Sequence, residues 1–432
     1  SRKIIVIGIT GTNGKTTTCQ MVAKIIEEAG FSVAMASTIN FKIKDNEWVN
    51  KTKFTTLSSW EVQQFITDAV KAGCRYLVLE TSSHALDQNR VWGVNYKTAV
   101  ITNITREHFD YHKSMKSYRA AKLKLFKSKL ENAIVNLDME GPEDFLKCGA
   151  KNIFGYSTQA KKVKIKALNN NLETKTKIIL AENIKLEAGN SQFNVNGYQF
   201  RINLPGKFNV ENSLSAICVG LAENIGLEKI KPALEKIKNI PGRMEKVPNN
   251  KGFNIIIDYA VTPDSLEKLY SLLYRIFNRK EPAIITEDQN KNTAEEIWGI
   301  SEKEENVIKE RPKIIAVFGS CGERDTGKRP IMGEIVSSYA DYVILTNEDP
   351  YHENPRKIIK EIANGVRNKT EGENFWKITD RRKAIKKALQ LAKTGDWIVV
   401  TGKGAEETMA IGDERIPWND KKVILEELKK LP

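Results

Sequence analysis

Residues 3–17 read KIIVIGITGTNGKTT, which places a glycine-rich turn between an apolar strand and the start of a helix. Glycines let backbone N–H groups wrap around phosphate oxygens, and a helix N-terminus adds positive potential. In such a turn Lys15 can reach the β and γ phosphates, and the Thr16 hydroxyl can ligate Mg²⁺. The general phosphate-loop pattern has glycine where this chain has Ile9. The string in its context still predicts an ATP site formed by Gly11, Thr12, Asn13, Gly14, Lys15, Thr16 and Thr17.

The segments after this turn alternate between strand and helix. Apolar residues that keep the helical or the strand period predict a helix and three strands, at residues 15–29, 32–36, 76–80 and 98–102. This alternation predicts an α/β fold with a mostly parallel, doubly wound sheet. Residues 160–204 alternate apolar with polar positions and predict a small antiparallel β insert, which a helix at 209–225 follows.

A second strand–helix series fills the C-terminal half. Residues 240–243, Ile-Pro-Gly-Arg, are typical of a linker, and strands are expected after it at 253–258, 314–318, 342–346 and 397–401. We therefore predict a central ATP-binding domain at 1–240 and a Rossmann-like C-terminal domain at 241–432. The charged segment 279–312 lacks periodicity and is interpreted as a mobile surface insertion.

Composition excludes several classes of protein. The chain has 432 residues and a net charge of +14, but its lysines are dispersed and not interleaved with aromatic residues, so a nucleic-acid partner is not expected. Five cysteines without a CxxC pair argue against a disulfide framework and a zinc ribbon and favour the cytoplasm. No apolar run reaches the ~20 residues of a membrane helix. Residue 1 is Ser, so a preceding tag, domain or anchor is left open.

Polar residues follow two of the predicted strands. Glu80 ends the strand at 76–80, and carboxyl strand ends of such sheets face the ligand crevice, where a carboxylate can hold Mg²⁺. Taken alone, Glu80 is more simply a helix cap or a surface residue. Three of the four histidines, His84, His108 and His112, fall within a short stretch and indicate a site. Their spacing is not that of a zinc set.

Taken together, these strings resemble the Mur ligases in order and spacing. The resemblance lies in residues 11–17, 80–84, 103–110, 118–122, 205–212, 242–244 and 258–264. Residues 322–330 and 402–406 are most similar to the MurE branch. The resemblance implies an ATP- and Mg²⁺-dependent ligase of peptidoglycan precursor synthesis. ATP would phosphorylate the terminal carboxylate of UDP-N-acetylmuramoyl-L-Ala-D-Glu, and the amine of an amino acid would attack the acyl phosphate.

The resemblance also implies roles for single residues. Lys15, Lys122, Glu80 and His108 would be catalytic, and Thr16, Glu80, His108 and Lys122 as a carbamate would surround Mg²⁺. A carbamate turns a cationic side chain into an oxygen ligand, whereas without the resemblance Lys122 is one more lysine on a basic helix. The positions that match adenine, phosphate and ribose contacts are Asn212, Arg243 and Asp258. Those that match muramoyl-dipeptide contacts are Thr55, Thr56, Ser82, Gln88 and Arg90.

The string Glu348-Asp349-Pro350-Tyr351 bears on the incoming amino acid. MurE enzymes that add meso-diaminopimelate carry Asp-Asn-Pro-Arg there, and tyrosine cannot form the bidentate charged pair of arginine. The two acids could instead attract the ammonium of L-lysine or L-ornithine, which we expect over diaminopimelate, or they could merely lie at a strand end. By resemblance, Arg324 would hold the α-carboxylate, and Gly402 and Glu406 would complete the pocket.

Departures from the family pattern leave alternatives open. Val261 and Ala405 stand where the family has histidine, and glutamate replaces aspartate at positions 107 and 323. The family's N-terminal UDP-binding domain has no counterpart here, so a separate domain or partner is possible. Another Mur-family ligase, for folylpolyglutamate or cyanophycin, is a second hypothesis. A silent nucleotide-binding scaffold of cell-wall assembly is a third, against which the retained catalytic residues argue.

Overall fold

The computed structural model describes residues 3–52, 54–159, 176–187, 189–277 and 311–431. It divides into two compact units, Ser1–Pro241 and Gly242–Pro432. Nearly all of the predicted surface insertion at 279–312, and the first part of the predicted β insert, lie outside the described residues. Among the described helices none is long and apolar enough to cross a membrane.

The first unit is built on a nine-stranded sheet in the order β4-β3-β2-β5-β1-β6-β7-β8-β9. Seven neighbouring strands are parallel, namely β1 (Ile5–Thr10), β2 (Val33–Ala36), β5 (Tyr76–Glu80), β6 (Tyr96–Ile101), β7 (Asn132–Asn136), β8 (Asn152–Ser157) and β9 (Thr176–Leu180). The edge strands β3 (Asn40–Ile43) and β4 (Asn46–Val49) are antiparallel. The prediction of a mostly parallel sheet is confirmed.

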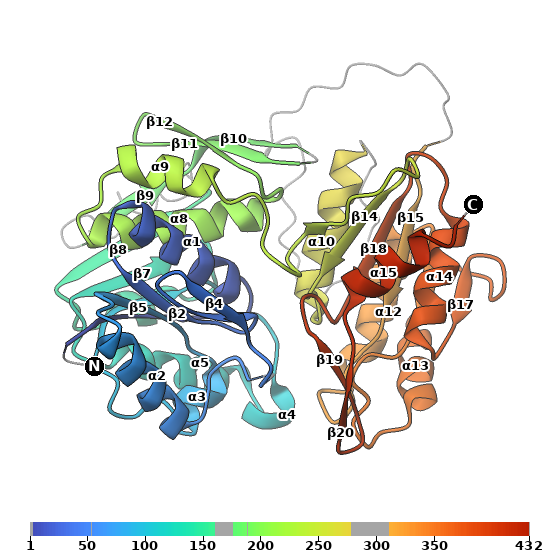
Figure 1. The fold of residues 1–432 in the computed structure, drawn as a ribbon, viewed down its shortest axis with the longest axis horizontal. Helices are drawn as coiled ribbons and strands as arrows, with labels where there is room; N and C mark the ends of the chain where they lie inside the picture. Colours follow the sequence, from blue (N-terminus) through green and yellow to red (C-terminus); the bar gives the residue numbers. More distant parts are fainter. Residues whose placement is uncertain (1–2, 53, 160–175, 188, 278–310, 432) are drawn as a thin grey trace. The chain divides into compact units, whose positions relative to one another are not determined.

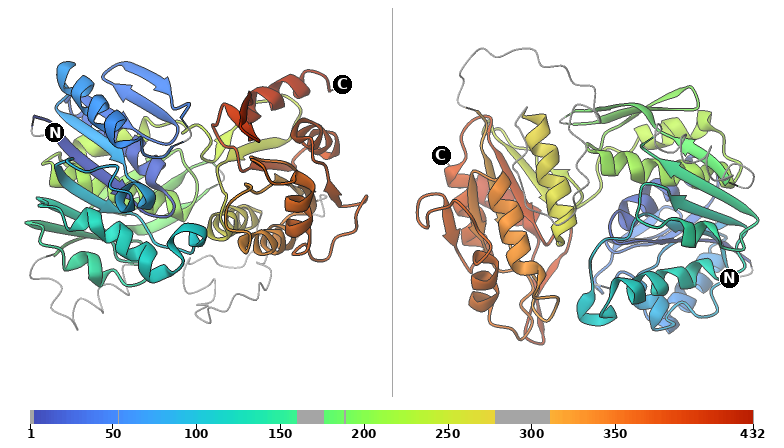
Figure 2. Two further views of the ribbon diagram at one scale, coloured as in Figure 1. Left: turned by 90° about the horizontal axis from the view of Figure 1, so that it is seen from below. Right: turned by 180° about the vertical axis from the view of Figure 1, so that it is seen from behind.

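Helices cover both faces of this sheet (Figure 1, Figure 2). Successive residues of β1 point to opposite faces, so Ile7 and Ile9 enter one core while Val6, with Ile4 just before the strand, enters the other. The first core is shared with α1 (Lys15–Glu28), α8 (Lys207–Ala222) and α9 (Leu227–Glu235). The second is shared with α2 (Ser59–Lys71), α3 (Ser83–Asp87), α5 (Met115–Phe126) and α6 (Glu143–Leu146), and the short α4 (Phe109–His112) precedes α5.

The predicted antiparallel insert is partly correct. Strands β10 (Glu182–Leu186), β11 (Ser191–Val195) and β12 (Tyr198–Ile202) form an antiparallel three-stranded sheet. Strand β9, which was expected in the insert, instead pairs in parallel with β8 and extends the large sheet. The alternating pattern of 176–180 suits either sheet, because a one-sided edge strand alternates in the same way as an antiparallel strand.

The second unit contains a six-stranded sheet in the order β13-β14-β18-β15-β16-β17. Its strands are β13 (Glu245–Lys246), which is antiparallel, and the parallel β14 (Asn254–Asp258), β15 (Ile314–Phe318), β16 (Tyr342–Leu345), β17 (Phe375–Lys377) and β18 (Trp397–Thr401). The helices are α10 (Pro263–Ile276), α12 (Lys328–Tyr339), α13 (Pro355–Ala363), α14 (Arg381–Leu391) and α15 (Asp420–Leu428). The hairpin β19 (Thr408–Ile411) and β20 (Glu414–Pro417) stands apart from the sheet.

The strand order shows where each unit can hold a ligand. In the first unit β1 lies between β5 and β6, and the strand order reverses there: β2 to β5 lie on one side of β1 and β6 to β9 on the other. Such a switch point opens a crevice at the carboxyl ends of the strands. In the second unit the carboxyl ends of β15, β16 and β18 lie next to one another. Lys15, Glu80 and His108 lie at or after such strand ends in the first unit, and Arg324, Glu348 and Gly402 do so in the second.

Candidate active site

The predicted phosphate loop connects β1 to α1 at the switch point. Gly14 has φ of +82°, and a Cβ there would lie 2.2 Å from Asn212 Oδ1, so the position requires glycine. Helix α1 begins at Lys15 with no acidic residue in its first turn and no side-chain cap, and Thr17 is buried in that turn. The free backbone N–H groups at the start of such a helix, with no acidic side chain nearby, can bind an anionic group such as a phosphate.

Contacts from the next strand end hold this loop in place. Asn13 N donates to Asn103 Oδ1 at 2.9 Å, and Asn103 Nδ2 donates to Asn13 O at 3.1 Å. Thr12 Oγ1 lies 3.1 Å from the Tyr118 hydroxyl and accepts from Thr105 N at 3.0 Å. The loop is therefore held by the segment after β6 and by α5.

The amines of Lys15 and Lys122 converge on one backbone carbonyl. Lys15 Nζ donates to Gly11 O (3.1 Å) and Thr12 O (2.7 Å), and Lys122 Nζ donates to Gly11 O at 2.8 Å. Lys122 is only 1% exposed. Burial, and next the Lys15 charge, lower the pKa of Lys122 well below that of an ordinary lysine. The environment of Lys122 therefore favours its neutral amine.

Glu80 is neither a helix cap nor a surface residue, because it is 1% exposed at the end of β5. Thr16 Oγ1 lies 3.1 Å from each of its carboxylate oxygens. Thr38 N donates to Oε2 at 2.7 Å, and Thr38 Oγ1 donates to Oε1 at 2.9 Å. These contacts fix the carboxylate beside the first turn of α1. Thr38 was not anticipated, since it follows β2 and carries no motif of its own.

The three clustered histidines come together in space. The His84 ring lies 4.6 Å from that of His108 and 5.4 Å from that of His112, between ring centroids. His108 has φ of +58°, and its Nε2 lies 3.6 Å from Glu107 Oε2. Burial lowers the pKa of His108, which favours the neutral imidazole that can ligate a metal. His112 is held instead by Ser83 Oγ at 3.0 Å.

These residues fit a nucleotide with Mg²⁺. Thr16 and Glu80 offer hard oxygen atoms side by side, next to the uncapped start of α1. Within the described part of the chain no group of three or more His, Cys, Asp or Glu side chains could hold a metal by itself. Mg²⁺ suits such a sparse set, because it keeps several waters and completes its shell with substrate phosphates.

The residues predicted for the muramoyl dipeptide lie near the end of β5, with one exception. Thr56 Oγ1 donates to Glu80 O at 2.8 Å and accepts from Ser82 N at 2.9 Å. Arg90 Nη1 donates to Thr56 O at 2.8 Å. Thr55 is partly exposed beside Thr56. Gln88 is exposed at the end of α3, and its side chain has no contact that ties it to this group.

Of the residues predicted to contact adenine, phosphate and ribose, one lies in the first unit and two lie in the second. Asn212 of α8 lies against the phosphate loop at Gly14, whereas Arg243 and Asp258 belong to the second unit. Asp258 Oδ2 accepts from Met244 N at 2.7 Å, which fixes the turn that carries Arg243. The guanidinium carbon of Arg243 lies 4.7 Å from the centre of the Tyr259 ring.

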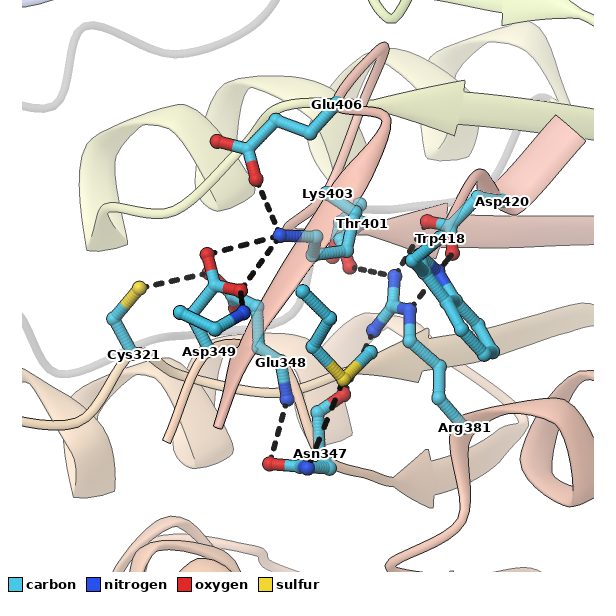
Figure 3. A network of polar contacts seen from close by, with 12 residues as sticks. Cys321, Asn347, Glu348, Asp349, Arg381, Thr401, Lys403, Glu406, Trp418 and Asp420 are labelled. Atoms are coloured by element: carbon cyan, nitrogen blue, oxygen red, sulfur yellow. Dashed lines mark hydrogen bonds and ion pairs between the residues drawn. The ribbon is translucent and has the colours of Figure 1, made fainter. Parts of the chain in front are cut away.

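The two acids predicted to attract an ammonium group differ in the structure. Asp349 is buried, and its oxygens accept from Lys403 Nζ at 2.8 and 2.9 Å and from Ala410 N at 2.7 Å. Lys403 also pairs with Glu406. Asp349 and Glu406 therefore already share an internal cation, Lys403 (Figure 3). That Asp349 attracts a ligand ammonium stays a prediction, and this pairing does not favour it.

Glu348 is different, because its Oε2 is buried without a hydrogen-bond partner. Its Oε1 accepts from Cys321 Sγ at 3.5 Å. A Cβ at Gly402, which has φ of +108°, would lie 2.6 Å from Glu348 Oε2, so only glycine leaves room there. Burial and the neighbouring Asp349 raise the pKa of Glu348, while Lys403 acts in the opposite direction. An unpartnered buried carboxylate oxygen costs free energy, and an incoming cation would satisfy it.

Tyr351 and Arg324 lie on the rim of the same cluster. Gly322 N donates to Asp349 O at 2.8 Å, which brings the turn before Arg324 next to the Glu348–Tyr351 string. Arg324 is exposed, and its guanidinium hydrogen-bonds the partly buried Tyr351 hydroxyl. The predicted residues Arg324, Glu348, Tyr351 and Gly402 therefore lie in one region. The role of Lys403 was missed, since its motif does not show that it faces two acids.

Comparisons with known proteins agree with this arrangement. Residues 9–220 match the Mur ligase middle domain, and residues 302–404 match the domain described as "Mur ligase, glutamate ligase domain". The chain is 35% identical over 437 residues to UDP-N-acetylmuramoyl-L-alanyl-D-glutamate--2,6-diaminopimelate ligase 1 of Clostridium acetobutylicum, covering 100% of this chain and 79% of that one. It is 33% identical to UDP-N-acetylmuramyl-tripeptide synthetase of Borreliella burgdorferi, covering 98% and 76%.

A solved structure of a UDP-N-acetylmuramoyl-L-alanyl-D-glutamate--2,6-diaminopimelate ligase superposes with a TM-score of 0.59 at 28% identity. The superposition covers 99% of this chain and 78% of that one. Sequence and fold therefore lead to the same family.

Proposed function

Since this chain belongs to the Mur ligase family, we propose that it joins an amino acid to UDP-N-acetylmuramoyl-L-Ala-D-Glu at the expense of ATP. The names of its relatives describe ligases and synthetases that act at this step of peptidoglycan precursor synthesis. The observation that carries the proposal is the convergence of Lys15, Lys122 and Glu80 around the start of α1.

Each of these groups has a separate part in the proposed reaction. Lys15 and the N-terminus of α1 place positive charge where the phosphates gather negative charge. Glu80 and Thr16 would hold Mg²⁺, which when bound offsets the charge between two anionic reactants. The neutral Lys122 amine is the form that adds to carbon dioxide, releasing a proton and leaving a carbamate oxygen ligand. Thr56, Ser82 and Arg90 would orient the muramoyl peptide.

For the incoming amino acid we favour L-lysine or L-ornithine over meso-diaminopimelate. A side-chain ammonium would meet the unpartnered Glu348 Oε2, while Tyr351 offers no cation for the distal carboxylate of diaminopimelate. Arg324 stands at the rim, where it can bind the α-carboxylate. The relative from Clostridium is named for diaminopimelate and the one from Borreliella names no amino acid, so this preference rests on Glu348 and Tyr351.

The test supplies ATP, Mg²⁺ and UDP-N-acetylmuramoyl-L-Ala-D-Glu with L-lysine, L-ornithine or meso-diaminopimelate in separate reactions. Phosphate release is followed together with product mass. Product with lysine or ornithine alone, lost in Glu348→Gln, supports both the ligase and its pocket. Product with diaminopimelate alone keeps the ligase and contradicts the role of Glu348. No product with any amino acid contradicts the proposed function.

A further inference from the structure

The second unit contains a buried ion pair that belongs to no predicted site. Arg381, at the start of α14, and Asp420, at the start of α15, are both 0% exposed at their side chains. Arg381 Nε and Nη2 donate to the two Asp420 oxygens at 2.8 and 2.6 Å. Trp418 Nε1 donates to Asp420 Oδ1 at 2.8 Å. A fully buried pair of this kind adds little net stability, because desolvation offsets the attraction.

The remaining donors of Arg381 reach two strand ends. Nη2 donates to Thr401 O, the last residue of β18, at 2.8 Å. Nη1 donates to Asn347 O, just beyond the end of β16, at 3.3 Å. Figure 3 shows the guanidinium lying between Asp420, Thr401 and Asn347. The planar fork of arginine can span these acceptors, whereas the single ammonium of lysine cannot.

The two carbonyls that Arg381 binds lie immediately before the residues of the candidate amino-acid pocket. Asn347 precedes Glu348, and Thr401 precedes Gly402. Glu348 Oε2 and Gly402 are in close approach, so a small shift of either strand end would change the space around that carboxylate. Because Arg381 connects the two strand ends, its side chain can set the distance between Glu348 and Gly402.

We propose that Arg381, held by Asp420, is a positioning residue that fixes the ends of β16 and β18 so that Glu348 and Gly402 form one amino-acid pocket. This inference rests on the proposed function for the identity of the pocket. In this proposal Arg381 acts on the pocket through the two backbone carbonyls that it binds. An apolar replacement of the pair would fill the volume without reaching those carbonyls.

The experiment compares Arg381→Lys and the double variant Arg381→Met/Asp420→Leu with the wild-type chain. The lysine variant keeps the ion pair, and the double variant removes both charges together, so neither leaves an unpaired buried charge. Arg382→Met is the matched control, because Arg382 also pairs with α15, through Glu426 and Glu427, but is half-exposed and reaches no strand end.

Two measurements are made on each protein. Hydrogen–deuterium exchange of the peptides covering 346–351 and 400–406 is expected to accelerate in both Arg381 variants and to stay unchanged in Arg382→Met. The KM for the amino acid is expected to rise roughly tenfold to a hundredfold, while the KM for ATP stays within about twofold, as expected for a displacement of about 1 Å. A thermal melt accompanies each variant.

The inference is overturned if the double variant keeps the wild-type hydrogen–deuterium exchange and the wild-type KM for the amino acid. The pair would then have a structural role only. If the double variant does not fold, Arg381→Lys decides by the same two measurements. If the wild-type chain ligates no amino acid, the proposed function fails, and exchange at the two strand ends still decides whether Arg381 positions them.

Discussion

Lys122 in the first unit and Lys403 in the second are both buried to within 1% of full burial, yet their surroundings are opposite. Lys122 donates to a backbone carbonyl and has another lysine nearby, and its pKa is lowered. Lys403 lies between Asp349 and Glu406, and its pKa is raised. Burial alone therefore does not determine the state of a lysine. Burial beside a second lysine favours the neutral amine at Lys122, whereas two neighbouring carboxylates favour the charged ammonium at Lys403.

The first prediction tests the proposed catalytic role of Lys122 and has the largest expected effect. Lys122→Met should reduce ligase activity about a thousandfold, or about 4 kcal/mol of transition-state stabilisation. The melting temperature, measured without Mg²⁺ or bicarbonate, should stay equal or rise by a few degrees, because a buried amine that resists protonation is removed. Lys124→Met on the same helix, an exposed lysine paired with Asp87, is the control and should change neither quantity. A clear fall in melting temperature would show that Lys122 is structural.

The second prediction tests the internal cation. Lys403→Met leaves the buried Asp349 and the partly buried Glu406 without their shared cation and should lower the free energy of unfolding by about 3 kcal/mol. Adding Asp349→Asn should recover part of that loss, since an unpaired charge is removed while an acceptor for Ala410 N remains. Urea unfolding of the single and double variants measures the coupling. Lys421→Met, which breaks the more exposed pair with Glu245, should cost less than about 1 kcal/mol. Equal losses in the two single lysine variants would contradict this account.

The third prediction concerns the carboxylate of Glu353 in the second unit, and its expected effect on stability is the smallest of the three. Glu353 accepts from both terminal nitrogens of the buried Arg329, which holds the Glu353 pKa at about 2. Its contribution to stability is therefore fully present above the unfolded pKa of about 4.3, and it is lost as the pH falls towards 2. At pH 6 wild type should exceed Glu353→Gln by about 1–2 kcal/mol in unfolding free energy, and the gap should narrow by pH 3. Glu426→Gln, at an exposed ion pair, should show a smaller gap. If the difference in unfolding free energy between wild type and Glu353→Gln does not change with pH, the ionisation of Glu353 is not its cause.

Much of the fold followed from local pattern. The strands at 76–80, 314–318 and 397–401 have the predicted bounds, and α1 begins at the predicted residue Lys15. Buried parallel strands are continuous apolar runs bounded by turns, so their signal lies within a few neighbouring residues. The phosphate loop was predictable for the same reason, because its backbone geometry depends on glycines that stand next to one another in the sequence.

By itself, then, the sequence determined the α/β architecture, the phosphate loop and the family resemblance. The tertiary structure alone decided that β9 joins the large sheet and that Thr38 donates to Glu80. It alone also decided that Lys403 forms an ion pair with Asp349, and that Arg381 binds the carbonyls at two strand ends. These contacts join residues about 20 to 50 positions apart, and no local period encodes which side chains meet when parallel strands are brought side by side. The reason is physical: backbone pattern sets each element, whereas the pairing of buried charges depends on which elements become neighbours.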